Sequence, residues 1–319
     1  MDIGYLLWLQ GIRTSSPPVV QAFFSFLGSD AASVAVMLIP CLAYWCLDKR
    51  RGLLALVAYG SSWLCNQLLK NTFCYPRPWL RDPRVIPDPT AIPGASGYSF
   101  PSGHTQSSAS MLVGLGWSWR ARRWPLALGV AVTLLVGFSR NFLGVHTPQD
   151  VLVGFVEGCL FVLLADRLIP WVDEEEGRDV RVVVAGLAIV AAYLAYVTLK
   201  PYPVDSLGVR LSADSADMVV DCYRAGGGFA GILLGWFAER RLVRLETGGL
   251  SAGRILLRMA VGMTVVLVAY KPVGHVVVSL LGAYTGQFVR HLLVFILAVA
   301  VVPALFAPLE HLACRKGRG

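Results

Sequence analysis

The sequence predicts an all-α protein, a polytopic integral membrane bundle of about nine transmembrane helices. Of its 319 residues, 55% are hydrophobic and only 15% are charged, and the mean hydropathy is +0.60. A typical soluble domain carries about 25% charged residues. Apolar runs close to the roughly 20 residues that cross a bilayer recur along the whole chain. The expected spans are 30–47, 52–70, 103–119, 125–142, 148–170, 180–199, 216–238, 255–271 and 284–308.

The stretch before the first span, residues 1–28, is expected to lie at the membrane interface. It has neither the basic start nor the small-residue cleavage site of a secretory signal. Arg13, Pro17 and Pro18 also interrupt its apolar run. Ser29 is a suitable N-cap for the span that follows.

Four groups of basic residues predict the orientation, because cytoplasmic loops are enriched in Lys and Arg. With nine spans and the N-terminus outside, all four groups and the C-terminus fall on the cytoplasmic side. The net charge of +8 is then mainly an orientation signal. Nucleic-acid binding is disfavoured because the groups are short and separated by spans. The groups lie at 49–51, 120–123, 240–258 and 315–318.

The seven cysteines show no metal-binding or redox pattern, since no C-x-x-C pair occurs. Most lie inside expected spans, where cysteine behaves as a small apolar residue. Cys74 and Cys222 both fall near the outer face, but we do not expect a disulfide between them.

Three polar segments are expected to meet at the outer face, and the most informative is SRNFLGVHTPQD, residues 139–150. Thr147 suits an N-cap and Pro148 suits the first helical position, so Asp150 falls one turn from His146. A carboxylate there can accept from one imidazole nitrogen and leave the other nitrogen free for chemistry. The alternative is that Thr147 and Asp150 form only a capping box.

The second segment, Pro-Ser-Gly-His at 101–104, precedes an apolar run and predicts a helix start. Free backbone N–H groups at such a start favour an anion, which Gly103 would allow to approach closely. His104 could then donate a proton to a leaving oxygen. The alternative is an ordinary helix start with a surface histidine.

The third segment, at 70–78, supplies two cations, Lys70 and Arg77. Together with Arg140 they would surround one small volume, and the planar fork of arginine suits phosphate oxygens. The alternatives are a lysine that snorkels from a helix end and an interfacial arginine.

In this order, K-x6-R-P, P-S-G-H and S-R-x5-H-x3-D resemble the three signatures of the type 2 phosphatidic acid phosphatase (PAP2) superfamily. Every signature position is matched, and the triple pattern is highly specific. The resemblance implies a PAP2/haloperoxidase-like helical core. Having only two spans before the first motif is similar to the glucose-6-phosphatase and sphingosine-1-phosphate phosphatase branch. We expect an interfacial segment at 1–28, the catalytic membrane core at 29–200, and further transmembrane helices of the same domain at 201–319.

The resemblance also implies roles for the motif residues. His146 would attack phosphorus and form a phosphohistidine, and Asp150 would orient it. His104 would protonate the leaving alcohol and then activate water. No cofactor is implied, and a metal on these three residues is disfavoured because the neighbouring cations would repel it. The residues implied to bind phosphoryl oxygens are Lys70, Arg77, Ser102, Gly103 and Arg140.

These features predict a metal-independent membrane phosphatase that hydrolyses a lipid phosphate monoester at the extracytoplasmic face. The alternatives are a phosphatase for an isoprenoid diphosphate such as undecaprenyl diphosphate, and one for a sugar phosphate. An anion transporter without turnover is a further class, but it would not need the spacing of His146 and Asp150. The expected partners are the lipid substrate and the bilayer, with no nucleic acid and no obligatory protein partner.

Several other polar and aromatic residues have no assigned role. Ionisable groups at membrane depth are costly and often functional. We expect paired structural charges, interfacial anchors and solvated loop charges, the alternative being that some of these residues contact the substrate. They are Glu157, Asp217, Asp221 and Arg224 within spans, Lys271 and His275 at the outer end of span 255–271, Arg81 and Arg84 in the proline-rich loop, and Tyr75, Trp79 and Tyr98 at the interface.

Overall fold

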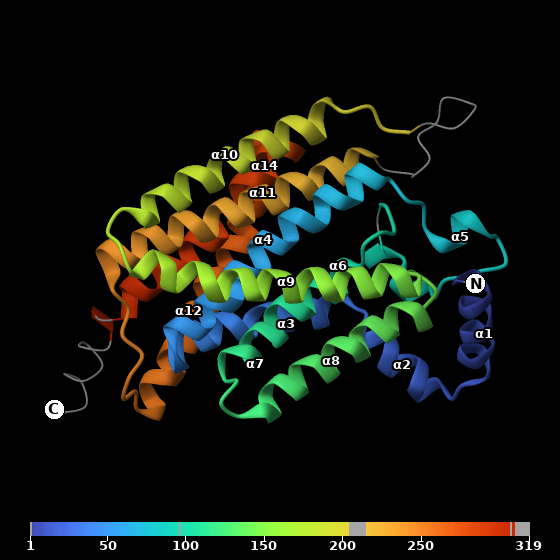
Figure 1. Ribbon diagram of the computed structural model, residues 1–319, viewed down its shortest axis with the longest axis horizontal. Coiled ribbons are helices and arrows are strands. Elements are labelled where there is room, and N and C mark those ends of the chain that lie inside the picture. Colours follow the sequence, from blue (N-terminus) through green and yellow to red (C-terminus); the bar gives the residue numbers. More distant parts are fainter. Residues whose placement is uncertain (1, 96, 204–214, 307, 310–319) are drawn as a thin grey trace.

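The computed structural model describes residues 2–95, 97–203, 215–306 and 308–309, and in those ranges it contains helices and loops but no strand. Most of the long helices run along the long axis of the molecule (Figure 1). The predicted all-α fold is therefore confirmed.

The predicted spans correspond one for one to helical stretches of the described chain. The first five are α3 (Asp30–Leu42) continued by the π-turn η1 (Ala43–Leu47), α4 (Lys49–Phe73), α6 (Gly103–Ser108) continued by η4 (Ala109–Val113) and α7 (Gly114–Ser118), α8 (Arg123–Phe142), and α9 (Pro148–Asp173). The others are α10 (Arg178–Leu199), α11 (Ser215–Ala238) with η5 (Glu239–Val243), α12 (Ala252–Val268) with η6 (Ala269–Val273) and α13 (Gly274–Leu281), and α14 (Ala283–Ile296) with η7 (Leu297–Val301).

Among the described residues, four stretches are long and apolar enough to cross a membrane by length and composition alone. They are Arg123–Phe142, Arg178–Leu199, Ala252–Leu281 and Ala283–Phe306. Helices α4 and α9 have 25 and 26 residues, but they carry polar side chains. On α4, Ser62, Asn66 and Lys70 are spaced four apart and all are buried. Polar groups in a span turn toward the protein interior, so the less apolar helices are those that bring polar groups inward.

Two short helices, α1 (Asp2–Ser15) and α2 (Pro18–Leu27), precede the first span. They lie at one end of the bundle, near the short helix α5 (Pro78–Arg81) (Figure 1). On the inner side Leu9 packs with Phe142, Leu143 and Val145. The outer side exposes large apolar residues, among them Trp8, Val19 and Phe26. An amphipathic pair of helices of this kind suits the membrane interface.

The helix starts that the sequence predicts are confirmed. The Ser29 side chain accepts from the backbone N–H of Ala32 at 3.2 Å. Thr147 caps α9 with Pro148 in its first turn, and α6 begins at Gly103 after Ser102.

The end of the eighth span was predicted wrongly. The predicted span ends at Lys271, but the helical run continues to Leu281 and ends at Gly282. The π-turn η6 contains Pro272, so the missing N–H of proline is accommodated without a break in the chain direction. Lys271 and His275 therefore lie within this run, exposed on its surface, and not at its end.

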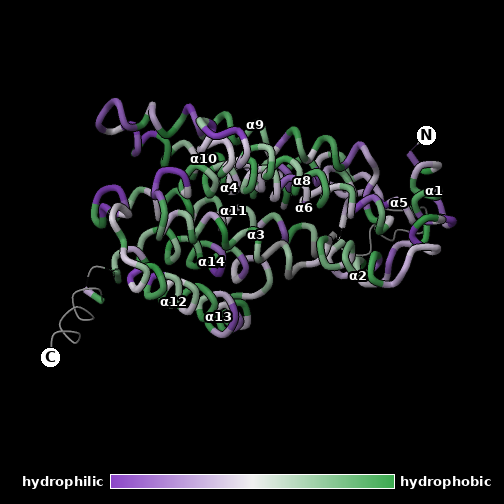
Figure 2. Tube along the Cα trace, turned by 90° about the horizontal axis from the view of Figure 1, so that it is seen from below, coloured by the Kyte–Doolittle hydropathy of each residue, from purple (hydrophilic) through white to green (hydrophobic). Residues whose placement is uncertain are grey.

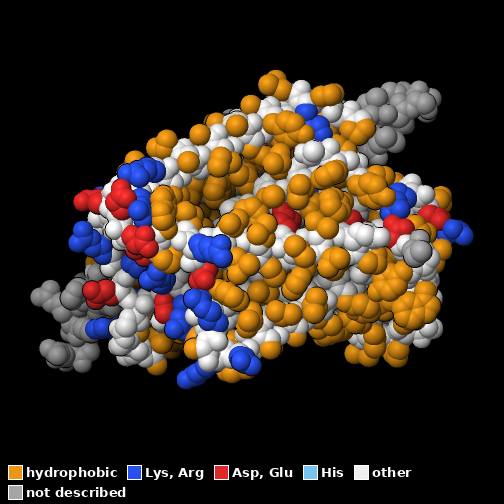
Figure 3. All heavy atoms as spheres, in the orientation of Figure 1, with side chains coloured by type: hydrophobic (Ala, Val, Ile, Leu, Met, Phe, Trp, Pro, Cys, Tyr) orange, Lys and Arg blue, Asp and Glu red, His pale blue; other side chains and the backbone are white. Residues whose placement is uncertain are grey.

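Helices α4 and α11 lie at the centre of the bundle, and α11 packs most extensively against α14 and α4. A Cβ at Gly227 on α11 would lie 2.1 Å from the carbonyl oxygen of Phe288 on α14, so only glycine permits this approach. Hydrophobic side chains cover the visible flank, and charged ones gather at the end that holds the α9–α10 connection (Figure 3). The hydropathy trace likewise shows hydrophilic loops at this end and hydrophilic residues around α1 and α5 at the other (Figure 2).

Candidate functional site

The start of α9 carries the carboxylate of Asp150, which accepts hydrogen bonds from more than one group. Thr147 and Asp150 form the capping box, and the backbone N–H of Thr147 donates to Asp150 Oδ2 at 2.8 Å. The hydroxyl of Ser99 donates to the same oxygen at 2.6 Å. Asp150 is 1% exposed, so these donors replace water around its charge. The side chain of Asp150 is fixed in one position as a result.

The imidazole of His146 lies between Asp150 and Arg77. Its Nδ1 is 3.4 Å from Asp150 Oδ2, and its Nε2 is 2.9 Å from Nη1 of Arg77. An arginine N–H can only donate, so Nε2 must be the acceptor and Nδ1 must carry the proton that faces the carboxylate. The unprotonated nitrogen therefore points away from Asp150, toward the cation. In this tautomer Nε2 holds the lone pair that a nucleophile needs.

The pKa of His146, which lies in the connection between α8 and α9, is lowered well below its ordinary value. Burial is the main cause and the charge of Arg77 is the next, while Asp150 acts in the opposite direction. A lowered pKa means that the neutral imidazole persists to more acidic pH than in a solvent-exposed histidine.

Arg77 follows the end of α4 and is itself held by backbone carbonyls. Its Nε donates to Gly97 O at 2.9 Å and its Nη1 to Val145 O at 3.0 Å. Burial and the nearby charge of Arg140 lower the pKa of Arg77. Two buried cations within electrostatic range of each other favour the binding of an anion nearby.

Lys70 lies in the last turn of α4, which ends at Cys74 in the left-handed conformation. The Lys70 side chain is 6% exposed, and its Nζ donates to Tyr98 O at 2.9 Å and to Ser99 O at 3.4 Å. Tyr98 is only 1% exposed, so its predicted place at the membrane interface is wrong. The reason is that its segment folds inward to supply carbonyls to Lys70.

Arg140, in the last turn of α8, is fully buried. Its Nη1 donates to Gly28 O at the end of α2, and its Nη2 contacts Gly94 O at 3.5 Å. A Cβ at Gly28 would lie 2.8 Å from that Nη1, so a side chain there would displace the guanidinium. The N-terminal helices thus fix the position of Arg140.

The Ser102–Gly103–His104 turn at the start of α6 is tied to α9. The backbone N–H of Ser102 donates to Asp150 O at 2.9 Å. A Cβ at Gly154 would lie 2.5 Å from Ser102 O, so glycine is required for this close packing. Nε2 of His104 is buried and has no hydrogen-bond partner within the described part of the chain. It is available to a bound molecule.

Sequence reasoning missed several residues that support these groups. Ser99 fixes Asp150. Arg13 on α1 is buried and donates to Phe142 O at 2.9 Å and to Ile86 O at 2.5 Å, next to the turn that carries His146. Gln10 pairs with the same loop, since its Nε2 donates to Arg84 O and its Oε1 accepts from Ile86 N. No local pattern reveals such contacts, although Arg13 stands out as a charge that interrupts an apolar run.

The remaining polar residues mostly have partners of their own. Asn66 Nδ2 donates to Glu157 Oε2 at 2.8 Å, and Arg224 pairs with Asp221 at 2.7 Å. Arg81 pairs with Asp2, and Arg84 pairs with Asp82. Cys74 and Cys222 are both free thiols, as expected. The side chain of Asp217 lies outside the described residues.

No group of three or more His, Cys, Asp or Glu side chains in the described part of the chain could hold a metal ion. The group on His146 Nε2 is instead the Arg77 guanidinium, and Lys70 lies within electrostatic range of the imidazole. Such an arrangement suits an anionic ligand with several oxygens, such as a phosphoryl group.

Two family models match the sequence. One, described as the PAP2 superfamily, matches residues 51–173, and the other, described as the PAP2 superfamily phosphatase transmembrane extension, matches residues 223–315. All three motif segments lie within the first match.

Named relatives match part of the chain. Undecaprenyl-diphosphatase BcrC of Bacillus subtilis (strain 168) is 33% identical over 163 residues, which cover 49% of this chain and 80% of that protein. Phosphatidylglycerophosphatase B of the same organism is 33% identical over 121 residues, which cover 35% of this chain and 55% of that protein. The crystal structure of a transmembrane PAP2-type phosphatidylglycerolphosphate phosphatase from Bacillus subtilis matches with a TM-score of 0.41 and 25% identity, covering 54% of this chain and 85% of that one.

Replacing Arg77 by Gln should raise the pKa of His146, because a cation that disfavours imidazolium is removed. The measurement is an NMR pH titration of histidine-labelled protein, with His146→Asn used to assign the resonance. Arg84→Gln is the matched control, since Arg84 is exposed and paired with Asp82. An unchanged His146 pKa in the Arg77 variant would show that the two side chains do not interact.

Proposed function

The chain belongs to the PAP2 superfamily of phosphatases, and we propose that it hydrolyses a lipid phosphate monoester through a phosphohistidine on His146. The observation that carries the proposal is the line Asp150–His146–Arg77, with contacts of 3.4 and 2.9 Å on either side of the imidazole. It supports a nucleophile whose proton is held by a carboxylate and whose lone pair faces a cationic site. The substrate class and the roles below are parts of this proposal.

In the first step Nε2 of His146 attacks phosphorus, and the bond between phosphorus and the leaving oxygen breaks. Asp150 holds the Nδ1 proton and stabilises the positive charge that develops on the ring. His104 gives its proton to the leaving oxygen, which departs as a lipid alcohol. Arg77 moves from Nε2 to a phosphoryl oxygen, since both positions are within reach of one guanidinium.

In the second step water attacks the phosphohistidine. His104, now neutral, takes a proton from the water, the P–N bond breaks, and inorganic phosphate leaves. Both histidines return to their starting protonation states. His104 acts as an acid in the first step and as a base in the second, because the direction of its proton transfer is reversed.

The charge of the transferring phosphoryl group is stabilised by fixed cations and backbone dipoles. Lys70, Arg77 and Arg140 supply the cations, and the Ser102–Gly103 turn supplies the start of α6. Phosphoryl transfer requires little beyond in-line positioning and charge stabilisation. The proposed reaction therefore needs no metal ion.

A lipid substrate fits the position of the site, which lies at one end of a bundle with an apolar flank (Figure 3). The acyl chains can stay in the membrane while the phosphate reaches the aqueous end. An isoprenoid diphosphate is the second candidate. It is favoured by the match to undecaprenyl-diphosphatase BcrC, of which 80% is covered. We propose further that the site faces away from the cytoplasm and that the C-terminus is cytoplasmic, because the basic groups at 49–51, 120–123 and 240–258 lie at the opposite end of the bundle.

Substitution of the two histidines should separate their roles. His146→Gln should abolish labelling of the protein by a ³²P-phosphomonoester in rapid-quench experiments. His104→Gln should slow turnover of a lipid phosphate by about 10²–10⁴-fold, the usual contribution of a general acid–base group. With p-nitrophenyl phosphate, whose leaving group needs no acid, His104→Gln should accumulate the acid-labile phosphoenzyme. Labelling of the His146 variant at the wild-type level would exclude His146 as the nucleophile.

A substrate panel should distinguish the two candidates. Purified protein assayed with phosphatidylglycerophosphate, phosphatidate, undecaprenyl diphosphate and glucose 6-phosphate should show the highest kcat/KM for a lipid monoester. The highest value for undecaprenyl diphosphate would establish the second candidate instead. Phosphate binding without release from any substrate would point to a transporter.

The orientation can be tested with single cysteines at the two ends of the bundle. In intact cells, Thr90→Cys should react with a membrane-impermeant thiol reagent, because Thr90 is an exposed residue of the loop beside the site. Glu176→Cys, in the exposed α9–α10 connection, is the matched control and should react only after lysis. The reverse pattern would invert the proposed orientation.

A further inference from the structure

A cavity of about 360 Å³ lies far from the site just described. Arg50 and Arg51 in the first turn of α4 contribute to its wall, whereas Lys70 lies in the last turn of the same helix. At 1.5 Å per residue, the 20 residues from Arg50 to Lys70 place the two sites about 30 Å apart. Asp166, which also lines the cavity, is 16 residues along α9 from Asp150, or about 24 Å. The cavity and the motif site therefore occupy opposite ends of the bundle.

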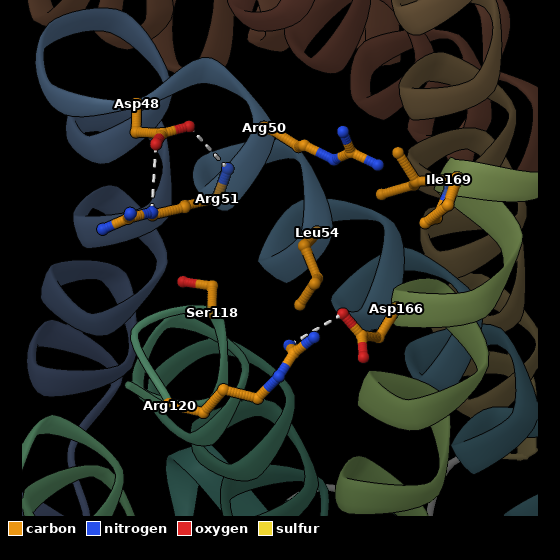
Figure 4. A pocket seen from close by; sticks show the side chains of 9 residues that line it. Asp48, Arg50, Arg51, Leu54, Ser118, Arg120, Asp166 and Ile169 are labelled. Carbon is orange, nitrogen blue, oxygen red and sulfur yellow. Dashed lines mark hydrogen bonds and ion pairs between the residues drawn. The ribbon is translucent and has the colours of Figure 1, made fainter. Parts of the chain in front are cut away.

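Two arginines approach the cavity from opposite sides. In Figure 4, Arg50 and Arg120 enter from above and below, Leu54 lies between them, and Asp166 stands to one side. Arg51 turns away toward Asp48, with its Nε 3.0 Å from Oδ2. Arg50 and Arg120 are thus the cations that face the space.

The carboxylates near the cavity are already engaged. Asp166 accepts from Arg120 Nη1 at 3.2 Å and from the indole N–H of Trp117 at 2.9 Å. The partner of Arg50 is Asp173 at 3.6 Å, and Asp173 is shared with Arg240. Three arginines and two aspartates line the space, and the third arginine has only the shared Asp173, which is not part of the lining, as its partner. Arg50 is the cation with the weakest compensation, and its side chain is 61% exposed.

The surroundings place the cavity at the level of lipid headgroups. The rings of Trp117 and Trp119 lie beneath Arg120 and Arg51, at 5.4 and 4.5 Å from the guanidinium carbons. Tryptophans with basic residues mark the boundary between acyl chains and water. Leu54, in contrast, gives the cavity an apolar side. A cationic rim beside an apolar surface matches an amphiphile, which has both a charged and an apolar part. A soluble anion would make no favourable contact with the apolar side.

We propose that this cavity binds the headgroup phosphate of an anionic phospholipid, held between Arg50 and Arg120. Basic pockets between transmembrane helices bind such headgroups, and arginine suits phosphate oxygens through its paired N–H groups. The general enrichment of basic residues on one side of a membrane explains why arginines gather here, but not why two of them face one hollow. The lipid would contact α4, the α7–α8 connection and α9 at once. The helices that begin or end at these points carry Lys70, His104 and Asp150 at the other end of the bundle.

The test is lipid binding by the full chain purified in detergent, followed by native mass spectrometry. The wild type should retain dioleoylphosphatidylglycerol in preference to dioleoylphosphatidylcholine. The double variant Arg50→Gln/Arg120→Gln should bind phosphatidylglycerol about 10- to 30-fold more weakly, since each basic residue near the surface contributes about 1 kcal/mol. Thermal unfolding gives a second readout, because a ligand that binds only the folded state raises Tm. Phosphatidylglycerol should raise the Tm of the wild type more than that of the variant.

Arg178→Gln/Arg181→Gln is the matched control, since these arginines lie at the same end in ion pairs with Glu174 and Glu175. Its phosphatidylglycerol affinity should equal that of the wild type. An equal loss in both double variants would mean that only overall charge matters and would overturn the proposal, as would equal retention of the two lipids. A further arm adds inorganic phosphate. If phosphate displaces phosphatidylglycerol at similar concentration, the site is one for a free anion and not for a lipid.

Discussion

The side chain of Asp150 is the constraint on which the geometry of the site depends. One oxygen receives the hydroxyl of Ser99 and the backbone N–H of Thr147, and it faces the imidazole of His146. Because the first two donors belong to different segments, the carboxylate ties the loop before α6 to the start of α9. The backbone carbonyl of Asp150 accepts from Ser102 and adds a second tie. The carboxylate of Asp150, which caps α9, therefore also fixes the orientation of the His146 imidazole.

The buried cations show a second common feature. Lys70, Arg77, Arg140 and Arg13 each donate to backbone carbonyls of loop or helix-end residues. Carbonyl dipoles offset part of the cost of burying a charge and hold each cation in one position. Cations fixed in this way suit the oxygens of the proposed phosphoryl ligand.

The sequence predicts the helices well because hydrophobic runs, caps and prolines are local signals. The capping box at Thr147 and Asp150 and the start of α6 at Gly103 follow from residues a few positions apart. The contacts that join distant segments have no such signal. Arg13 reaches Phe142 across 129 positions, and the burial of Tyr98 follows from the folding of its loop beneath Lys70. The helical run of the eighth span continues past Pro272 because the π-turn η6 contains this proline, which an α-helix interior would disfavour.

The central claim is that His146 faces a phosphoryl group held by Lys70, Arg77 and Arg140. It is tested most directly by a cryo-EM or crystal structure of the protein with inorganic phosphate bound. The account predicts phosphate in contact with these three cations and with the start of α6, its phosphorus within about 3–3.5 Å of His146 Nε2. Phosphate bound away from His146, with Arg77 still on Nε2, would contradict it.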